Sequence, residues 1–191
     1  MAEETRWLDD AERDVWRTFI TMTSALTDSL DRQLQRDAKM PYTYYEILVV
    51  LSEAPRRELR MSELAGLRGS SRSRLSHAVS RLEEAGWVER RECPTDKRGQ
   101  LAVLTDAGFA ALAAAAPGHV TAVRESLFDR LTAEQVRVLG EISAAVLGGL
   151  DPDMLLPGNH PPDPARGCGG GHVAEPPHTP EVGRPEVGAD T

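Results

Sequence analysis

A change of hydrophobic period at one glycine limits what the middle of this chain can form. From Arg72 to Ala85 the apolar residues recur every three or four positions, as they do along one face of a helix. After Gly86 the period becomes two, in the segments WVERRE and QLAVLT, which the turn-forming sequence PTDKRG separates. The pattern predicts a helix that a left-handed Gly86 ends, followed by a β-hairpin.

The helix predicted from residue 72 to about residue 85 has two different faces. One face is apolar and consists of Leu75, Ala78, Val79, Leu82 and Ala85. The other carries Ser73, Ser76, His77, Ser80 and Glu84, with Arg74 and Arg81 on one flank. A brief helix over residues 63–67, with Ser62 as its cap, and a turn at residues 69–71 precede it. Short helix, turn, second helix and hairpin follow each other in the order of a winged helix-turn-helix.

The flanking sequence is helical as well. Asp9 and Glu12 form a capping-box pattern at the start of a long amphipathic helix that ends before Pro41, and a short apolar helix runs from Tyr44 to Glu53, with Pro55 and a basic turn after it. Thr105 caps an alanine-rich helix that Pro117 and Gly118 are expected to interrupt, and Thr132 with Gln135 opens a last helix.

These patterns predict a mainly α fold with a small β-hairpin wing. We expect an N-terminal dimerisation helix in residues 1–40, a winged helix-turn-helix DNA-binding lobe in residues 41–105 and C-terminal dimerisation helices in residues 106–150. Residues 151–191 hold 9 of the 13 prolines and 7 of the 16 glycines with almost no apolar residue after Leu156. That composition predicts a disordered tail.

The net charge of -8 argues at first against a nucleic-acid partner, because DNA phosphates attract cations. The charge is uneven, however: residues 54–100 carry 11 basic and 7 acidic side chains, whereas each of the other segments is acidic. Distant charges are screened within about 8 to 10 Å, so the local basic patch sets the field that a duplex meets. DNA binding therefore stays compatible with the acidic total.

The predicted helix over residues 72–85 is suited to the major groove, where base edges show distinct donors and acceptors and where free amides of its first turn meet phosphate. Arg74 is a candidate for either a guanine edge or a phosphate, and Arg72 for a phosphate. His77 is either a DNA contact or an idle exposed imidazole.

The predicted hairpin adds a second contact, because an arginine at its tip is suited to the narrow minor groove. Asp96 either holds Arg98 in a reaching conformation or only forms the turn, and Gly99 permits a tight return. The candidate DNA-binding residues are Arg72, Ser73, Arg74, Ser76, His77, Ser80, Arg81, Asp96, Lys97, Arg98 and Gly99.

The segment from Tyr45 to Gly108 resembles the MarR family of bacterial transcription regulators. The stretches SELAGLRGSSRSRLSHAVSRLEEAGWVER and CPTDKRGQLAVLTDAG carry the resemblance, with the family's Asp-x-Arg at Asp96 and Arg98 and its Leu-Thr-x-x-Gly at Leu104, Thr105 and Gly108. The flanking helices extend it over about residues 7–150. It implies a homodimer that binds a pseudo-palindromic operator, usually as a repressor, and often leaves DNA when a small, commonly aromatic or phenolic, ligand binds between the dimer helices and the reading lobe.

The candidate ligand-binding residues are Arg13, Trp16, Phe19, Tyr44 and Tyr45, of which Arg13 is placed to meet an anion. The competing interpretation of the four aromatic residues is ordinary core. Family members that sense peroxides carry a cysteine near the end of the first long helix, where this chain has none. Cys93 instead leads into the wing, so thiol sensing is not expected, although Arg91 nearby is a feature in its favour.

Other function classes find little support. Ser76 and His77 are neighbours on a helix and point about 100° apart, and no carboxylate pair, phosphate loop or metal motif is present, so we expect no enzyme and no cofactor. Cys168, His172 and His178 lack a second ligand cluster, so no metal is expected. A scaffold that docks a protein through its helices remains an alternative, which the acidic tail favours and the basic middle opposes.

The chain has no run of about 18 apolar residues, and its start MAEETRWLDDAER has no apolar signal core. Its two cysteines make no disulfide framework. We therefore expect a cytoplasmic protein with no membrane contact. Its expected partners are double-stranded DNA and a second copy of itself, and the resemblance implies a small aromatic or phenolic effector as well.

Overall fold

The computed structural model describes residues 5–67, 72–93 and 96–150, and of Leu67, Arg72 and residues 96–98 it describes the backbone alone. In these ranges the elements are α1 (Asp10–Ala38), α2 (Tyr42–Glu53), η1 (Pro55–Arg57), β1 (Glu58–Arg60), α3 (Met61–Leu67), α4 (Arg72–Glu84), β2 (Val88–Cys93), β3 (Asp96–Leu104), α5 (Asp106–Ser126), η2 (Phe128–Arg130) and α6 (Ala133–Gly149). This mainly helical fold with a small sheet is the class that the sequence predicts. The tail expected over residues 151–191 and the turn expected at residues 69–71 lie outside the described residues.

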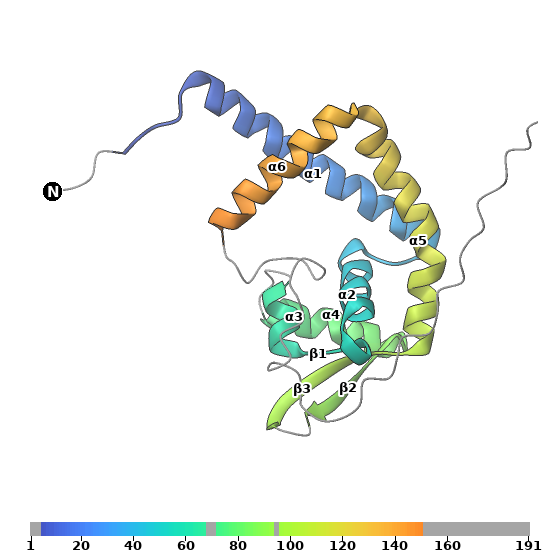
Figure 1. The fold of residues 1–191 in the computed structure, drawn as a ribbon. Coiled ribbons are helices and arrows are strands. Elements are labelled where there is room, and N and C mark those ends of the chain that lie inside the picture. Colours follow the sequence, from blue (N-terminus) through green and yellow to red (C-terminus); the bar gives the residue numbers. More distant parts are fainter. Residues whose placement is uncertain (1–4, 68–71, 94–95, 151–191) are drawn as a thin grey trace, which may run out of the picture.

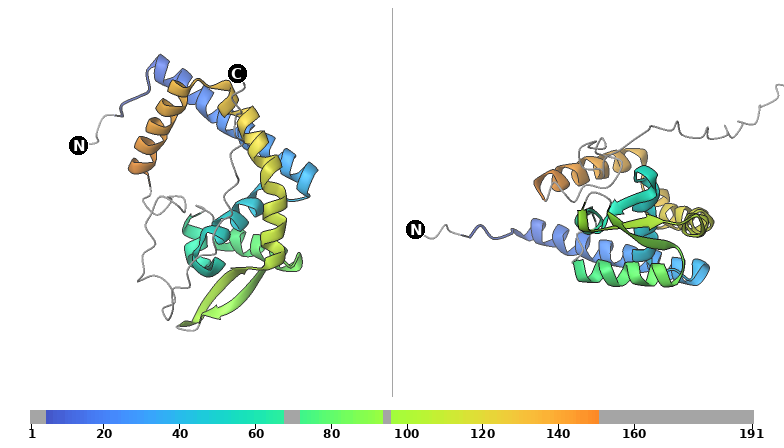
Figure 2. Two further views of the ribbon diagram at one scale, coloured as in Figure 1. Left: turned by 45° about the vertical axis from the view of Figure 1, so that its right-hand side comes forward. Right: turned by 90° about the horizontal axis from the view of Figure 1, so that it is seen from below.

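Helices α1, α5 and α6 gather at one end of the molecule, and α2 to α4 lie with the sheet at the other (Figure 1). Helix α5 joins the two ends, packing on α1 and on α2. Helix α6 and the first half of α1 cross in that view but lie apart when seen from below (Figure 2). No helix in the described ranges is long and apolar enough to span a membrane.

The starts of α1 and α6 follow the predicted caps, whereas Ser62, predicted as the cap of a helix over residues 63–67, lies inside α3 because that helix begins at Met61. The Asp9 carboxylate accepts from the Glu12 amide at 2.8 Å while Glu12 accepts from the Asp9 amide at 2.9 Å, which completes a capping box at α1. Thr132 and Gln135 do the same at α6. Lys39 ends α1 in the left-handed conformation, and Pro41 precedes α2.

The interruption expected at Pro117 and Gly118 is wrong, because α5 continues from Asp106 to Ser126 with Pro117 inside it. A proline leaves the carbonyl four residues earlier without its helical donor. Here that carbonyl belongs to the exposed Ala113. Packing of α5 on α1 favours a continuous helix. A Cβ at Gly118 would stand only 3.3 Å from the side-chain nitrogen Nε2 of Gln33 on α1. The glycine thus marks a close approach of two helices.

The sheet has one strand more than the predicted hairpin. Strand β1 pairs antiparallel with β3, with Leu59 opposite Ala102, and the strand order is β1-β3-β2. Before it, Arg56 and Arg57 both adopt φ near 56°, in the left-handed region, where the sequence predicted only a basic turn after Pro55. Three residues carry too short an alternation to signal a strand, so only pairing with β3 reveals β1.

The core lies where α2, α3 and α4 meet the sheet and the ends of α1 and α5. Its largest fully buried side chains are Leu34, Met40, Ile47, Leu48, Leu51, Leu64, Val79 and Leu82. The apolar face predicted for α4 is confirmed at Leu75, Val79 and Leu82, which are buried. Ala85 is exposed, because it follows the last helical residue.

Candidate nucleic-acid interface

Helix α4 ends at the predicted glycine. Gly86 has φ 73°, its amide donates to the Glu83 carbonyl at 2.9 Å, and the Trp87 amide donates to the Leu82 carbonyl at 2.9 Å. These two bonds form a Schellman motif, which only a left-handed residue completes. The motif turns the chain directly from α4 into strand β2, so the helix and the wing are joined without a flexible linker.

The outer face of α4 carries small and basic side chains. Ser73, Arg74, His77 and Arg81 are exposed there, as the sequence predicts. The Arg81 guanidinium donates to the Glu84 carboxylate at 2.7 Å, and this hydrogen bond raises the pKa of Arg81 above its ordinary value. Arg81 therefore presents a charge that Glu84 partly neutralises.

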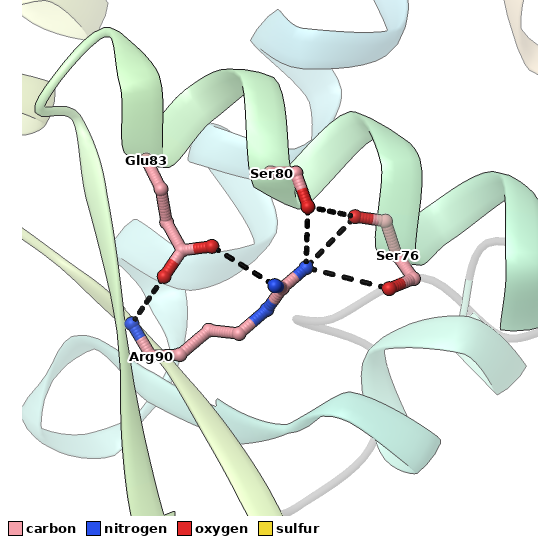
Figure 3. A network of polar contacts seen from close by, with 4 residues as sticks. All are labelled: Ser76, Ser80, Glu83 and Arg90. Atoms are coloured by element: carbon pink, nitrogen blue, oxygen red, sulfur yellow. Dashed lines mark hydrogen bonds and ion pairs between the residues drawn. The ribbon is translucent and has the colours of Figure 1, made fainter.

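Two of the predicted DNA-binding serines contact the wing through Arg90, although Ser76 is exposed. The Ser80 hydroxyl donates to the Ser76 carbonyl at 3.0 Å and accepts from the Arg90 guanidinium at 3.0 Å (Figure 3). The same Arg90 nitrogen lies 2.8 Å from the Ser76 carbonyl oxygen. Ser80 is half-buried, so its polar side chain belongs to the contact between α4 and β2.

Arg90 was not among the residues singled out from the sequence. Its Nη1 forms an ion pair with the Glu83 carboxylate at 3.0 Å, and its backbone amide donates to the other Glu83 oxygen at 3.1 Å (Figure 3). A signal for it exists in the alternation of β2: Arg90 shares a side of the strand with the buried Val88. A charged residue at an inward position is expected to have a partner.

The second strand of the wing is longer than the sequence predicts. Strand β3 begins at Asp96, so Gly99 lies inside it, and the expectation that Gly99 makes the return of the turn is wrong. The register jumps from Glu92 opposite Gln100 to Cys93 opposite Asp96, which leaves residues 97–99 as an irregularity in β3. Such a bulge bends the end of the wing.

The structure does not describe the side chains of Arg72, Asp96, Lys97 and Arg98. Asp96 therefore keeps both predicted roles, holding Arg98 in a reaching conformation or only forming the turn. Cys93, at the end of β2, is buried with Leu101 and Val103 in a small cluster of the wing. Burial shields its thiol from solvent, in line with the expectation that it is not a sensor.

The Leu-Thr-x-x-Gly motif forms the junction of wing and α5. The Thr105 hydroxyl donates to the Gly86 carbonyl at 2.8 Å and accepts from the Gly108 amide at 3.0 Å, which caps α5 as the sequence predicts. The Thr105 amide donates to the Trp87 carbonyl at 3.1 Å. A Cβ at Gly108 would stand 2.1 Å from that carbonyl oxygen. The motif therefore locks the end of α4, the wing and α5 together.

The five candidate ligand-binding residues do not form one site within a protomer. Arg13, Trp16 and Phe19 lie on the exposed first half of α1, where Arg13 pairs with Asp10. Tyr44 and Tyr45 lie on α2, which contacts the other end of α1: the Tyr42 amide donates to Asp31 at 2.8 Å. Tyr44 lines an open groove of about 580 Å³ between α2 and α4, whose other lining residues are Pro41, Thr43, His77, Ala78, Ser80, Arg81 and Glu84.

Tyr45 is buried against a histidine that sequence reasoning missed. The rings of Tyr45 and His119 lie 4.4 Å apart between α2 and α5, and Tyr42 lies 5.8 Å from the same imidazole. The buried Nδ1 of His119 has no hydrogen-bond partner. Burial lowers the pKa of His119 below its ordinary value of 6.5, because the charged form loses hydration there.

Replacing His119 by Gln is expected to make stability less sensitive to acid. With the folded pKa below 6.5, the unfolded chain binds a proton that the folded chain does not, so the stability due to neutral His119 is present above pH 6.5 and lost as the pH falls toward the folded value. The melting temperature of wild type should therefore drop more steeply than that of His119→Gln between about pH 7 and pH 5. Parallel pH profiles of the two proteins would contradict this.

In the described part of the chain no group of three His, Cys, Asp or Glu side chains could hold a metal ion. The tail residues Cys168, His172 and His178 lie outside that part.

Known proteins share this fold and much of this sequence. The model of the MarR family matches residues 38–99. Sco3205, a MarR family transcriptional regulator from Streptomyces coelicolor solved in complex with DNA, is 58% identical, with a TM-score of 0.75, and the match covers 81% of this chain and 98% of that one. AbsC, a MarR family transcriptional regulator from the same organism, is 40% identical with a TM-score of 0.70, over 76% of this chain and 100% of that one.

A more distant relative is the transcriptional repressor MprA of Escherichia coli, 27% identical over 71% of this chain and 76% of its own length. The relatives named here are regulators rather than enzymes, in agreement with the expectation for this chain. With 58% identity over nearly the full length of a MarR family regulator, together with the shared winged-helix fold, this chain belongs to the MarR family of transcriptional regulators.

Proposed function

We propose that this protein is a cytoplasmic homodimeric repressor that binds a pseudo-palindromic operator in double-stranded DNA. The observation that carries the proposal is the exposed face of α4, where Ser73, Arg74, His77 and Arg81 stand beside the wing. Short side chains let a helix approach base edges closely, and flanking cations meet phosphate. The DNA complex of Sco3205 and the name of the repressor MprA support the same reading.

The dimer is supported by apolar surface that one protomer leaves uncovered. On α1, Val15, Trp16, Phe19 and Ile20 are between 44% and 68% exposed. On α6, Val136, Ile142 and Val146 are between 36% and 54% exposed, and no α6 residue is buried. Exposed apolar stripes of this kind mark interaction surfaces. A two-fold pair would cover them and set two α4 helices about 34 Å apart, one turn of DNA.

Release by a small aromatic or phenolic effector is the finer part of the proposal. A ligand shifts the equilibrium between two spacings of the α4 helices only through its different affinity for each. The groove at Tyr44 supports such a coupling, because its lining joins α2 to His77 and Arg81 on α4. In the dimer, Arg13, Trp16 and Phe19 are further candidates for contact with the effector.

The proposal is tested by footprinting the purified protein on the region upstream of its own gene. We expect a protected site with two half-sites and a gel-shift complex that fades with salt, because phosphate contacts release counterions. A protein that retards no duplex at low ionic strength is not a DNA-binding regulator. If aromatic acids and phenols fail to dissociate the complex, release by an effector is contradicted, but DNA binding is not.

Arg98→Ala is expected to weaken operator binding by about tenfold, because a minor-groove arginine would be lost from the wing. The slope of log affinity against log salt concentration should become shallower by the amount expected for one lost phosphate contact. Gel shifts or fluorescence anisotropy over a salt series measure both. Unchanged affinity would take the wing out of DNA binding. Arg130→Ala, at the distant turn before α6, is the control.

Arg74→Ala separates base reading from phosphate binding. If Arg74 donates two hydrogen bonds to a guanine, the variant should lose about 1 to 3 kcal/mol of binding free energy on the operator. The loss should be much smaller on a duplex in which that base pair is changed. Competition binding with single-base operator variants measures the difference. An equal loss on every sequence would assign Arg74 to phosphate.

A further inference from the structure

Arg90 connects the wing to the DNA-facing helix through one guanidinium. From β2 it reaches two successive turns of α4: its Nη2 lies 2.8 Å from the Ser76 carbonyl oxygen, 3.4 Å from the Ser76 hydroxyl and 3.0 Å from the Ser80 hydroxyl (Figure 3). Its Nη1 lies 3.0 Å from Glu83, one turn further on. The contacts span positions 76, 80 and 83, which share one face of a helix.

The geometry of this contact differs from that of an ordinary surface ion pair. The Arg90 and Glu83 side chains are only 23% and 31% exposed, and Glu83 also accepts from the Arg90 backbone amide at 3.1 Å. Charge-assisted hydrogen bonds in a partly buried site are stronger than exposed pairs and hold a narrower geometry. Arg90 and Glu83 together thus fix α4 against the wing at both backbone and side-chain level.

The same bonds decide which α4 side chains are available to a duplex. The Ser80 hydroxyl gives its proton to the Ser76 carbonyl and takes one from Arg90. The Ser80 side chain is thereby turned toward the wing, whereas Arg74, Ser76, His77 and Arg81 stay exposed. The polar face of α4 is therefore divided between internal bracing and outward contact.

We propose that Arg90 and Glu83 are positioning residues, which set the angle between α4 and the wing so that both meet one DNA site in register. This inference rests on the proposed function. It assigns the Ser80 side chain and the Ser76 carbonyl to the brace, whereas the exposed Ser76 side chain stays a candidate for base contact. A brace of this kind matters for the operator, which requires both elements at once, and matters little for loose binding to any duplex, which long-range charge drives.

The decisive variant is Glu83→Gln in the full chain. Removing a negative charge close to DNA would by electrostatics alone tighten binding, whereas loss of the brace weakens it. We expect operator affinity to fall about tenfold for Glu83→Gln and for Arg90→Gln, the effect of losing a charge-assisted hydrogen bond. The double variant should lose no more than the worse single one, because both act through one contact. Affinity for a scrambled duplex should change less than about twofold, and the salt slope should stay as in wild type.

Arg91→Gln is the matched control, since Arg91 neighbours Arg90 on β2 but is 59% exposed and pairs with Glu89. It should leave operator affinity nearly unchanged. Arg90→Lys keeps the positive charge and one hydrogen bond but loses the two-pronged guanidinium, so it should recover part of the operator affinity. It also serves as the test if Arg90→Gln does not fold. Tighter or unchanged operator binding by Glu83→Gln overturns the brace, and so does an equal loss on operator and scrambled duplex. A salt slope shallower by about one phosphate contact in Arg90→Gln would place Arg90 on DNA instead. If wild type binds no duplex, the proposed function itself fails.

Discussion

Gly108→Ala is expected to lower the free energy of unfolding by about 3 kcal/mol or more, the upper range for forcing extra volume into a packed site. The added Cβ would stand 2.1 Å from the Trp87 carbonyl oxygen and 2.8 Å from a methyl carbon of Leu104. The first of these neighbours is backbone, so neither a rotamer change nor a small side-chain shift relieves the contact. The first turn of α5 must then move away from the start of β2.

That movement would break more than one interaction. The Gly108 amide bonds to the Thr105 hydroxyl, and Thr105 in turn holds the Gly86 and Trp87 carbonyls. We therefore expect chemical unfolding at equilibrium to show a much lower midpoint for Gly108→Ala, and operator binding to weaken in the fraction that stays folded. An unfolding free energy within about 1 kcal/mol of wild type would contradict the close approach.

Gly66→Ala is the control for the effect of the methyl group alone. A Cβ at Gly66, in α3, meets nothing within 4 Å. In a helix such a replacement is neutral or stabilising by up to about 1 kcal/mol. The two glycines therefore have opposite expected signs, which a general intolerance to alanine would not produce.

Ile142→Asp is expected to abolish the dimer and, with it, operator binding by about 100-fold or more. Ile142 is 54% exposed on the apolar side of α6, where the proposed partner would cover it. Burying an unpaired carboxylate at a subunit contact is costly, so the equilibrium moves to monomers. A monomer loses the second half-site and the affinity that the linked second contact supplies.

Sedimentation and operator titration of the same samples measure the two effects together. Ala144→Asp is the matched control, since Ala144 is exposed on the opposite side of α6 and adds the same charge. It should leave both the mass and the affinity close to wild type. A dimeric Ile142→Asp protein would show that α6 is not in the contact. A monomer that still binds the operator normally would separate dimerisation from DNA binding.

How far such effects follow from sequence depends on the range of the interactions involved. Three local features illustrate the short range: the Asp9–Glu12 capping box, the cap that Thr105 forms with Gly108, and the left-handed Gly86. Each involves residues at most a few positions apart in the sequence. Local backbone chemistry decides them, and all three were predicted correctly. The apolar period of α4 likewise identified the buried Leu75, Val79 and Leu82, because burial of one helix face imposes that period.

The sequence by itself therefore determined the order of the main helices and the wing strands, the caps of α1, α5 and α6, and the family, since these reside in short-range patterns. Only the tertiary structure decided where long-range contacts override them. Strand β1 exists because β3 pairs with it, and α5 passes through Pro117 while it packs on α1. Arg90 became visible as a partner of Ser76, Ser80 and Glu83 once β2 lay beside α4. Such contacts join residues whose separation along the chain carries no periodic signal, and the free energy of packing chooses among them.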